Sequence, residues 1–156
     1  MAFAVSLLAF VPASVLAAPM CNNANRPIDV SATNLAFGTY SPGSPSPTNS
    51  NSTVKVYCAN ASDRLPSFTV ALSPGGAGGF NPRQLSFGSA RLNYNMYTTP
   101  TYTIIWGDGT SGTSTQSYNA NLNQNQVSFT DYGRVSPGQF VTGGGYADTI
   151  TVTVTY

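Results

Sequence analysis

The last ten residues printed, Ala147 to Tyr156 (ADTITVTVTY), decide the fold class of this chain. Apolar and polar side chains alternate along them, which is the pattern of a β-strand with one buried face. The apolar face consists of Ile150, Val152, Val154 and Tyr156, and threonines occupy the other face. Because the printed sequence stops here, we expect one side of this strand to stay unpaired and to need a covering partner.

Shorter alternating segments precede this one and predict further strands. They span residues 28–37, 54–58, 68–72, 92–96, 102–106 and 127–129. Between them, the proline-rich stretch 43–51 predicts a loop, the glycine-rich stretch 73–82 predicts a turn, and the polar stretch 111–125 predicts a weak edge or loop. About seven strands at this spacing predict an all-β fold, a β-sandwich of the immunoglobulin-like type.

Charge is scarce in this chain. Only 7% of its 156 residues are charged, against about 25% in ordinary soluble domains, and the formal net charge is +1. So weak a charge excludes a surface that follows nucleic-acid phosphates. The sequence has no histidine, which is the commonest general base and metal ligand. We therefore expect no catalysis, no cofactor, no metal site and no nucleic-acid partner.

Two polar motifs have an alternative chemical interpretation. Residues 106–109 (WGDG) are similar to part of a calcium loop, but they offer one carboxylate where six to eight oxygen ligands are needed, so a tight turn beside a packed Trp106 is expected. Asp108, Asp131 and Asp148 are candidates for the carboxylate pair of a glycosidase. Aspartates beside strand ends usually bind turn amides instead, and we favour that role.

The first 18 residues predict a secretory signal peptide. They are apolar and end in small residues, with cleavage expected after Ala17 or Ala18. No basic residue precedes the apolar run, which indicates either a start further upstream or a late methionine. A transmembrane anchor is the alternative, but the run is short and is broken by Pro12. We expect an exported domain over residues 19–156 with no stable membrane insertion after cleavage.

Two cysteines, Cys21 and Cys58, agree with export. An even number in an exported chain predicts a disulfide, which would stabilise the fold by about 4 kcal/mol on a loop-entropy argument. The alternative is a pair of buried free thiols, which an oxidising compartment disfavours.

Several segments resemble one known family when their order and spacing are taken together. They are 31–42 (SATNLAFGTYSP), 54–58 (VKVYC), 92–97 (LNYNMY), 106–110 (WGDGT), 132–139 (YGRVSPGQ) and 145–156 (GYADTITVTVTY). This set resembles the spore coat protein U domain family, which includes the subunits of Csu-type (archaic) chaperone–usher pili. The resemblance extends over essentially the whole chain after the predicted signal peptide.

The resemblance implies an immunoglobulin-like sandwich that lacks its final strand. A periplasmic chaperone would lend a strand to the gap, and the N-terminal extension of a neighbouring fibre subunit would later replace it. The resemblance also implies a Cys21–Cys58 disulfide and passage through the periplasm and an outer-membrane usher to the cell surface of a Gram-negative bacterium. The implied groove lies between the first and last strands, with Val30, Leu35 and Phe37 facing Ile150, Val152, Val154 and Tyr156.

This chain is expected to accept a strand without giving one. After the predicted cleavage only Pro19 and Met20 precede Cys21, a span under ~11 Å that is too short for a donor strand. An acceptor-only subunit belongs at a fibre tip, alone or as one domain of a longer tip protein. If the signal were not cut, the alternating residues Phe3, Val5, Leu7, Ala9 and Val11 would be an alternative donor strand.

A tip position draws attention to aromatic side chains on loops. Phe80, Tyr97 and Tyr102 are candidates for apolar contact with a target surface, with ordinary packing at strand ends as the alternative. Two other roles remain open for the chain as a whole. One is a self-associating coat or biofilm-matrix protein, and the other is a secreted carbohydrate-binding β-module.

Overall fold

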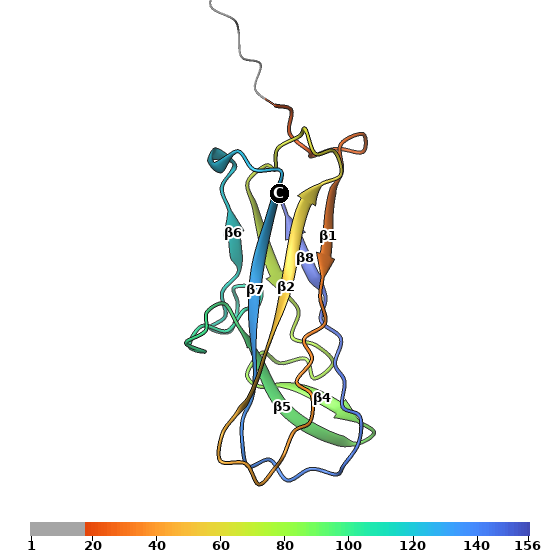
Figure 1. Cartoon of the computed structure of the whole chain (residues 1–156), viewed down its shortest axis with the longest axis vertical. Helices are drawn as coiled ribbons and strands as arrows, with labels where there is room; N and C mark the ends of the chain where they lie inside the picture. Colours follow the sequence, from red (N-terminus) through yellow and green to blue (C-terminus); the bar gives the residue numbers. More distant parts are fainter. Residues whose placement is uncertain (1–17) are drawn as a thin grey trace, which may run out of the picture.

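The computed structural model describes residues 18–156, so the predicted signal peptide lies outside the described residues except for Ala18. Strands dominate the described chain, and they lie roughly along the long axis of the molecule (Figure 1). The strands are β1 (Ile28–Ala32), β2 (Thr48–Cys58), β3 (Phe68–Leu72), β4 (Arg83–Phe87), β5 (Ala90–Tyr97), β6 (Gln116–Tyr118), β7 (Gln126–Val135) and β8 (Val152–Thr155). A single 3-10 turn, η1 (Ala120–Leu122), lies between β6 and β7.

The strands form two antiparallel sheets. One has the order β1-β2-β7-β5-β4 and the other has the order β6-β3-β8. In the first sheet, Val54 and Val56 of β2 are buried and pair with Phe129 and Val127 of β7. Because paired residues share a face, this alternation fixes which face of the sheet covers the core.

The second sheet supplies the opposite wall of the core. Val70 and Leu72 of β3 are almost fully buried, and they pair with Val154 and Val152 of β8. Trp106 lies fully buried in this core, and its indole N–H donates to the carbonyl of Val70 at 3.0 Å. Ile150, Val152 and Val154 of the apolar face expected for the last strand therefore pack against the core, whereas Tyr156 is exposed.

One edge of the sandwich is open. β8 pairs with β3 on one side, and no strand among residues 18–156 pairs with its other side. β1 likewise ends the order of the first sheet, where it pairs with β2 alone. The fold is an incomplete immunoglobulin-like β-sandwich, as the sequence predicts.

Three predicted segments are wrong. The strand predicted over 28–37 ends at Ala32, and the residues after it line the sheet without regular pairing. The loop predicted over 43–51 ends early, because Thr48–Asn51 already pair with β7 and the prolines all precede Thr48. The strand predicted over 102–106 is a loop that starts with Tyr102 at a φ of 55° and touches β5 through one isolated bridge, Tyr97 to Ile105. A left-handed residue cannot continue an extended strand.

The final strand is shorter than its alternation suggests. Regular pairing covers only Val152–Thr155, whereas Ala147 crosses to β4 and exchanges backbone hydrogen bonds with Ser86 at 2.8 and 3.1 Å. The segment from 147 to 155 therefore touches both sheets in turn. No helix of the described chain has the length and apolar character needed to cross a membrane.

Candidate functional site

An open groove lies beside the segment that leads into β8, and it reaches the strand itself at Val152. It consists of two adjoining cavities of about 510 and 630 Å³ between residues 32–42, which follow β1, and residues 141–152, which lead into β8. Both cavities share the side chains of Leu35, Phe37, Leu85 and Tyr146, so we treat them as one groove. Its floor is formed by side chains of both sheets, including Leu72 and Tyr94.

The predicted groove residues are only partly brought together. Leu35, Phe37, Ile150 and Val152 line the groove. Val154 is half-buried against the core, whereas Val30 and Tyr156 are 42% and 62% exposed, and none of these three lines either cavity. Val30 pairs with the buried Val56, so it lies on the inner face of its sheet and is left uncovered there.

A glycine positions the wall that carries Leu35 and Phe37. A Cβ built at Gly133 of β7 would come within 2.6 Å of the Leu35 side chain and 2.9 Å of Phe37. The segment after β1 can therefore lie directly on the inner face of β7, where Phe37 packs edge-on against Tyr94 at 5.8 Å. Glycine inside an alternating strand is the sequence signal for such a close approach.

The opposite wall is fastened by Asp148. Its Oδ2 accepts the hydroxyl of Tyr94 at 2.8 Å, and its Oδ1 accepts the backbone N–H groups of Gly76 and Thr149, each at 2.8 Å. Burial, helped by this hydrogen bond and by the nearby negative charge, raises the pKa of Tyr94 well above its usual value. The phenol therefore stays a neutral donor, and the wall is tied both to the floor and to the 73–82 turn.

A second carboxyl lies deeper, beside the groove. Asp131 is fully buried on β7, and its Oδ2 accepts the hydroxyl of Ser52, which lines the groove, at 3.0 Å. Burial raises the pKa of Asp131 to about 6, although Ser52 and the positive charge of Arg83 both favour the ionised form. Asp148 binds Tyr94 and turn amides, which matches the favoured role, whereas Asp131 lies within β7 and binds Ser52 instead.

This raised pKa predicts the pH dependence of stability. The folded chain binds the Asp131 proton more tightly than the unfolded chain, whose value is near 3.8, so the stabilisation is complete below that pH and is lost as the pH rises through about 6. We expect this group to lower the free energy of unfolding by about 3 kcal/mol between acidic and neutral pH. Urea unfolding at a series of pH values, with a β-strand peptide filling the groove, measures this loss of stability. The Asp131→Asn variant should lack this component, and an unchanged slope in that variant would contradict the assignment.

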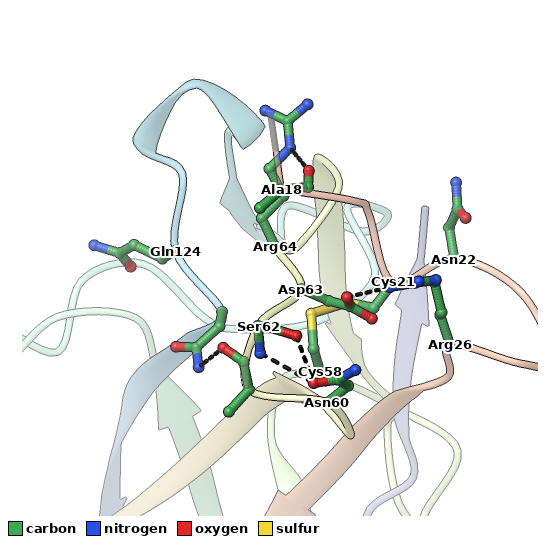
Figure 2. Close-up of a disulfide and its surroundings, with 12 residues drawn as sticks. Ala18, Cys21, Asn22, Arg26, Cys58, Asn60, Ser62, Asp63, Arg64 and Gln124 are labelled. Atoms are coloured by element: carbon green, nitrogen blue, oxygen red, sulfur yellow. Dashed lines mark hydrogen bonds and ion pairs between the residues drawn. A yellow bond between two sulfur atoms is a disulfide. The ribbon is translucent and has the colours of Figure 1, made fainter. Parts of the chain in front are cut away.

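The disulfide predicted between Cys21 and Cys58 is present, and both cysteines are buried (Figure 2). Cys58 ends β2, whereas Cys21 lies ahead of β1 rather than within it. Arg64 holds the segment before Cys21, because its backbone N–H donates to the carbonyl of Pro19 at 2.9 Å and its Nε donates to that of Ala18 at 2.9 Å. An Arg26–Asp63 ion pair lies beside the bridge.

The candidate surface aromatics do not form an exposed cluster. Phe80 is buried beneath the guanidinium of Arg83, 5.2 Å from its ring, so the expectation of surface contact is wrong for this residue. Tyr97 and Tyr102 are half-buried and pack edge-on at 5.5 Å, and Arg134 stacks 3.6 Å from the Tyr102 ring. These contacts match the alternative of packing at strand ends.

Sequence reasoning missed the most exposed aromatic side chain of the described chain. Phe140 is 86% exposed on the loop between β7 and β8. The loop itself is tied down, because Gln139 donates from its backbone to the hydroxyl of Tyr40 at 2.8 Å and from its side chain to the carbonyl of Asn93 at 2.9 Å. A phenylalanine between glycines and hydroxyl residues, PGQFVTGGG, is the signal that could have drawn attention to it.

Comparisons with known proteins agree with this architecture. Among solved structures, the chain is similar to one in the CsuC–CsuE chaperone–tip adhesion subunit pre-assembly complex from archaic chaperone–usher Csu pili of Acinetobacter baumannii. The TM-score is 0.55 at 21% sequence identity, and the match covers 84% of this chain and 40% of that one, so the chain spans less than half the length of its structural relative. No curated protein matches the sequence. Residues 8–153 match the Spore Coat Protein U domain, and the chain therefore belongs to the Spore Coat Protein U domain family.

Proposed function

We propose that this chain is a subunit of a bacterial surface fibre assembled by a chaperone–usher route, and that its groove accepts a β-strand from a partner protein. The observation that carries the proposal is the unpaired edge of β8 beside an open, mostly apolar groove. A strand added to this edge would hydrogen-bond to the β8 backbone and cover Ile150 and Val152. The role is structural and involves no chemical step.

The energetics of the groove support a requirement for a partner. A donor strand that buries four or five apolar side chains contributes roughly 1.5–3 kcal/mol for each, which is comparable with the whole stability of a domain. The half-covered side chains of Leu35, Phe37, Ile150 and Val152 leave that stabilisation unrealised in the chain by itself. An isolated chain is therefore expected to be unstable or to associate through this edge.

The proposed partners follow from this route. A periplasmic chaperone would fill the groove first, the outer-membrane usher would receive the complex, and a neighbouring fibre subunit would then replace the chaperone strand. The structural similarity to a chain of a chaperone–tip adhesion subunit pre-assembly complex supports a chaperone as the first of these partners. A tip-like, acceptor-only position rests on the signal cleavage expected after Ala17 or Ala18, and the domain would then span residues 19–156.

Replacing Val152 with aspartate tests the groove. Val152 lines it, so a charge at this position would be desolvated by an entering strand, and we expect capture by the co-expressed chaperone to fall at least about tenfold. Thr153→Asp is the matched control, because Thr153 is exposed on the opposite face of the same strand. Co-purification from the periplasm measures both variants.

Two results would contradict the proposal. Equal capture of the Val152→Asp and Thr153→Asp variants would show that the groove face is not used. A chain that is purified alone as a stable, monodisperse monomer would instead favour a self-sufficient module such as a carbohydrate-binding domain. N-terminal sequencing of the exported protein separately tests the acceptor-only position, since an N-terminus far upstream of Cys21 would contradict it.

A further inference from the structure

Asp148 gives the groove a single charged position. Among the described residues that line the two cavities, no other side chain carries a formal charge at neutral pH. Building on the proposed function, we propose that the strand occupying the groove carries one basic side chain that faces Asp148, with apolar side chains at its other inward-facing positions.

The carboxylate of Asp148 has capacity for one more donor. An ionised carboxyl offers about four acceptor positions. Three are used, by Gly76 and Thr149 on Oδ1 and by Tyr94 on Oδ2. All three donors are neutral, so none of these hydrogen bonds brings a positive charge to the carboxylate.

The described basic side chains are engaged elsewhere. The ion pair found in residues 18–156 joins Arg26 to Asp63, next to the disulfide. Arg83 attracts Asp148 through space, but its guanidinium is buried and donates to the carbonyls of Ser73 and Trp106 and to the amide of Asn95. A strand that covers Asp148 with apolar groups would therefore desolvate an unpaired charge, which is costly.

The position of Asp148 in the wall defines the expected pattern. Every second side chain of a strand lies on the same face, about 6.6–6.8 Å from the next one on that face. If one residue of the partner strand lies opposite Asp148, the residues two positions before and after it therefore meet apolar surface. That surface is Ile150, Val152 and Leu72 toward β8, and Tyr146 and Leu85 toward the other end. The aliphatic stem of a lysine or arginine can lie along such surface while its charged end reaches the carboxylate.

Synthetic peptides provide the test. End-capped peptides of about nine residues match residues 146–154, with valine at inward positions alternating with threonine at outward positions. Each peptide of the set replaces one inward valine by lysine. A control peptide has norleucine at the same position, because norleucine is similar to lysine in length but carries no charge. The full chain is refolded with each peptide, and thermal unfolding is followed by the fluorescence of Trp106, the single tryptophan, which is fully buried.

We expect one inward position at which the lysine peptide binds within about threefold of its norleucine pair, while lysine at the other inward positions weakens binding at least about tenfold. Tighter binding appears as a higher unfolding midpoint. In the Asp148→Asn variant, the tolerated lysine peptide should lose about tenfold in affinity and its norleucine pair should be unchanged. Asparagine can still accept the Gly76 and Thr149 bonds, and the norleucine midpoint reports whether the wall has kept its shape.

Two failures are distinguishable in this experiment. If no peptide of any composition raises the midpoint, the groove does not accept a strand, and the proposed function fails together with the inference. If the valine and norleucine peptides bind but lysine is tolerated nowhere, or is tolerated equally well in the Asp148→Asn variant, the groove accepts strands and the assigned basic position is wrong. The peptide comparison on the unmodified chain is decisive by itself, so the inference does not depend on the variant folding.

Discussion

Replacing Arg83 with methionine is expected to lower the free energy of unfolding by about 3–5 kcal/mol. The Arg83 side chain is fully buried, and it donates to the carbonyl of Ser73 from Nε at 3.1 Å and from Nη2 at 2.9 Å. It also donates to the carbonyl of Trp106 at 2.7 Å and to Oδ1 of Asn95 at 3.0 Å. Methionine fills much of the same volume but removes the donors to the carbonyls of Ser73 and Trp106, while Oδ1 of Asn95 keeps only the backbone N–H of Met96.

The consequence should reach the groove. Ser73 exchanges hydrogen bonds with Thr151, just ahead of β8, through its own backbone N–H and hydroxyl, both at 2.9 Å. Loss of Arg83 therefore loosens the wall that carries the open edge. Arg91→Met is the matched control, because Arg91 is exposed and bonds only to carbonyls of the neighbouring turn, and it should change stability by less than about 0.5 kcal/mol. Both variants are unfolded in urea with the all-valine groove peptide bound, and equal losses of stability would contradict the assigned role.

Removing the disulfide is expected to cost a further, comparable amount. The Cys21–Cys58 bridge closes a separation of 37 residues, and on the loop-entropy argument its loss raises the entropy of the unfolded chain by the equivalent of about 4 kcal/mol. The Cys21→Ser, Cys58→Ser double variant avoids leaving one reactive thiol. Urea unfolding of the chain with the all-valine groove peptide bound, followed by Trp106 fluorescence with the oxidised wild-type chain as the reference, measures the difference in stability.

Chemical reduction separates the contribution of the disulfide from that of the Arg64 hydrogen bonds that hold the same segment. Treating the wild-type chain with a reductant should shift its unfolding midpoint to that of the double serine variant, and the same treatment should leave the double variant unchanged. A wild-type chain whose midpoint does not move when its thiols are demonstrably free would show that the hydrogen bonds of Arg64 to Ala18 and Pro19 are enough to hold this segment.

Strands with local alternation and a buried face were predictable from sequence. Residues 54–58 and 68–72 are examples, because each carries apolar residues at every second position and those residues do face the core. β4 (RQLSF) was not predicted, since the buried side chain at its start is an arginine whose burial depends on acceptors supplied by Ser73, Asn95 and Trp106. No pattern within five residues can show such a set of distant partners.

In the groove, too, residues in local patterns were predictable and residues that depend on distant partners were not. Leu35, Phe37, Ile150 and Val152 were identified from the family resemblance and the alternation, and they line the groove. The fastening role of Asp148 was not predicted, because its partners come from Tyr94 on β5 and from the turn at Gly76, far away in sequence. Phe80 was a candidate for surface contact because it lies in the glycine-rich stretch 73–82, although the fold places Arg83 over its ring.

The bridge between Cys21 and Cys58 also has a mechanical consequence. If the mature chain continues ahead of Cys21, as it would with an uncut signal segment, tension on that segment passes through the covalent link into the end of β2 rather than into the short β1. β2 lies between β1 and β7, and its ten-pair ladder with β7 runs parallel to such a pull. The load is thus spread as shear over many hydrogen bonds at once instead of peeling them apart one by one.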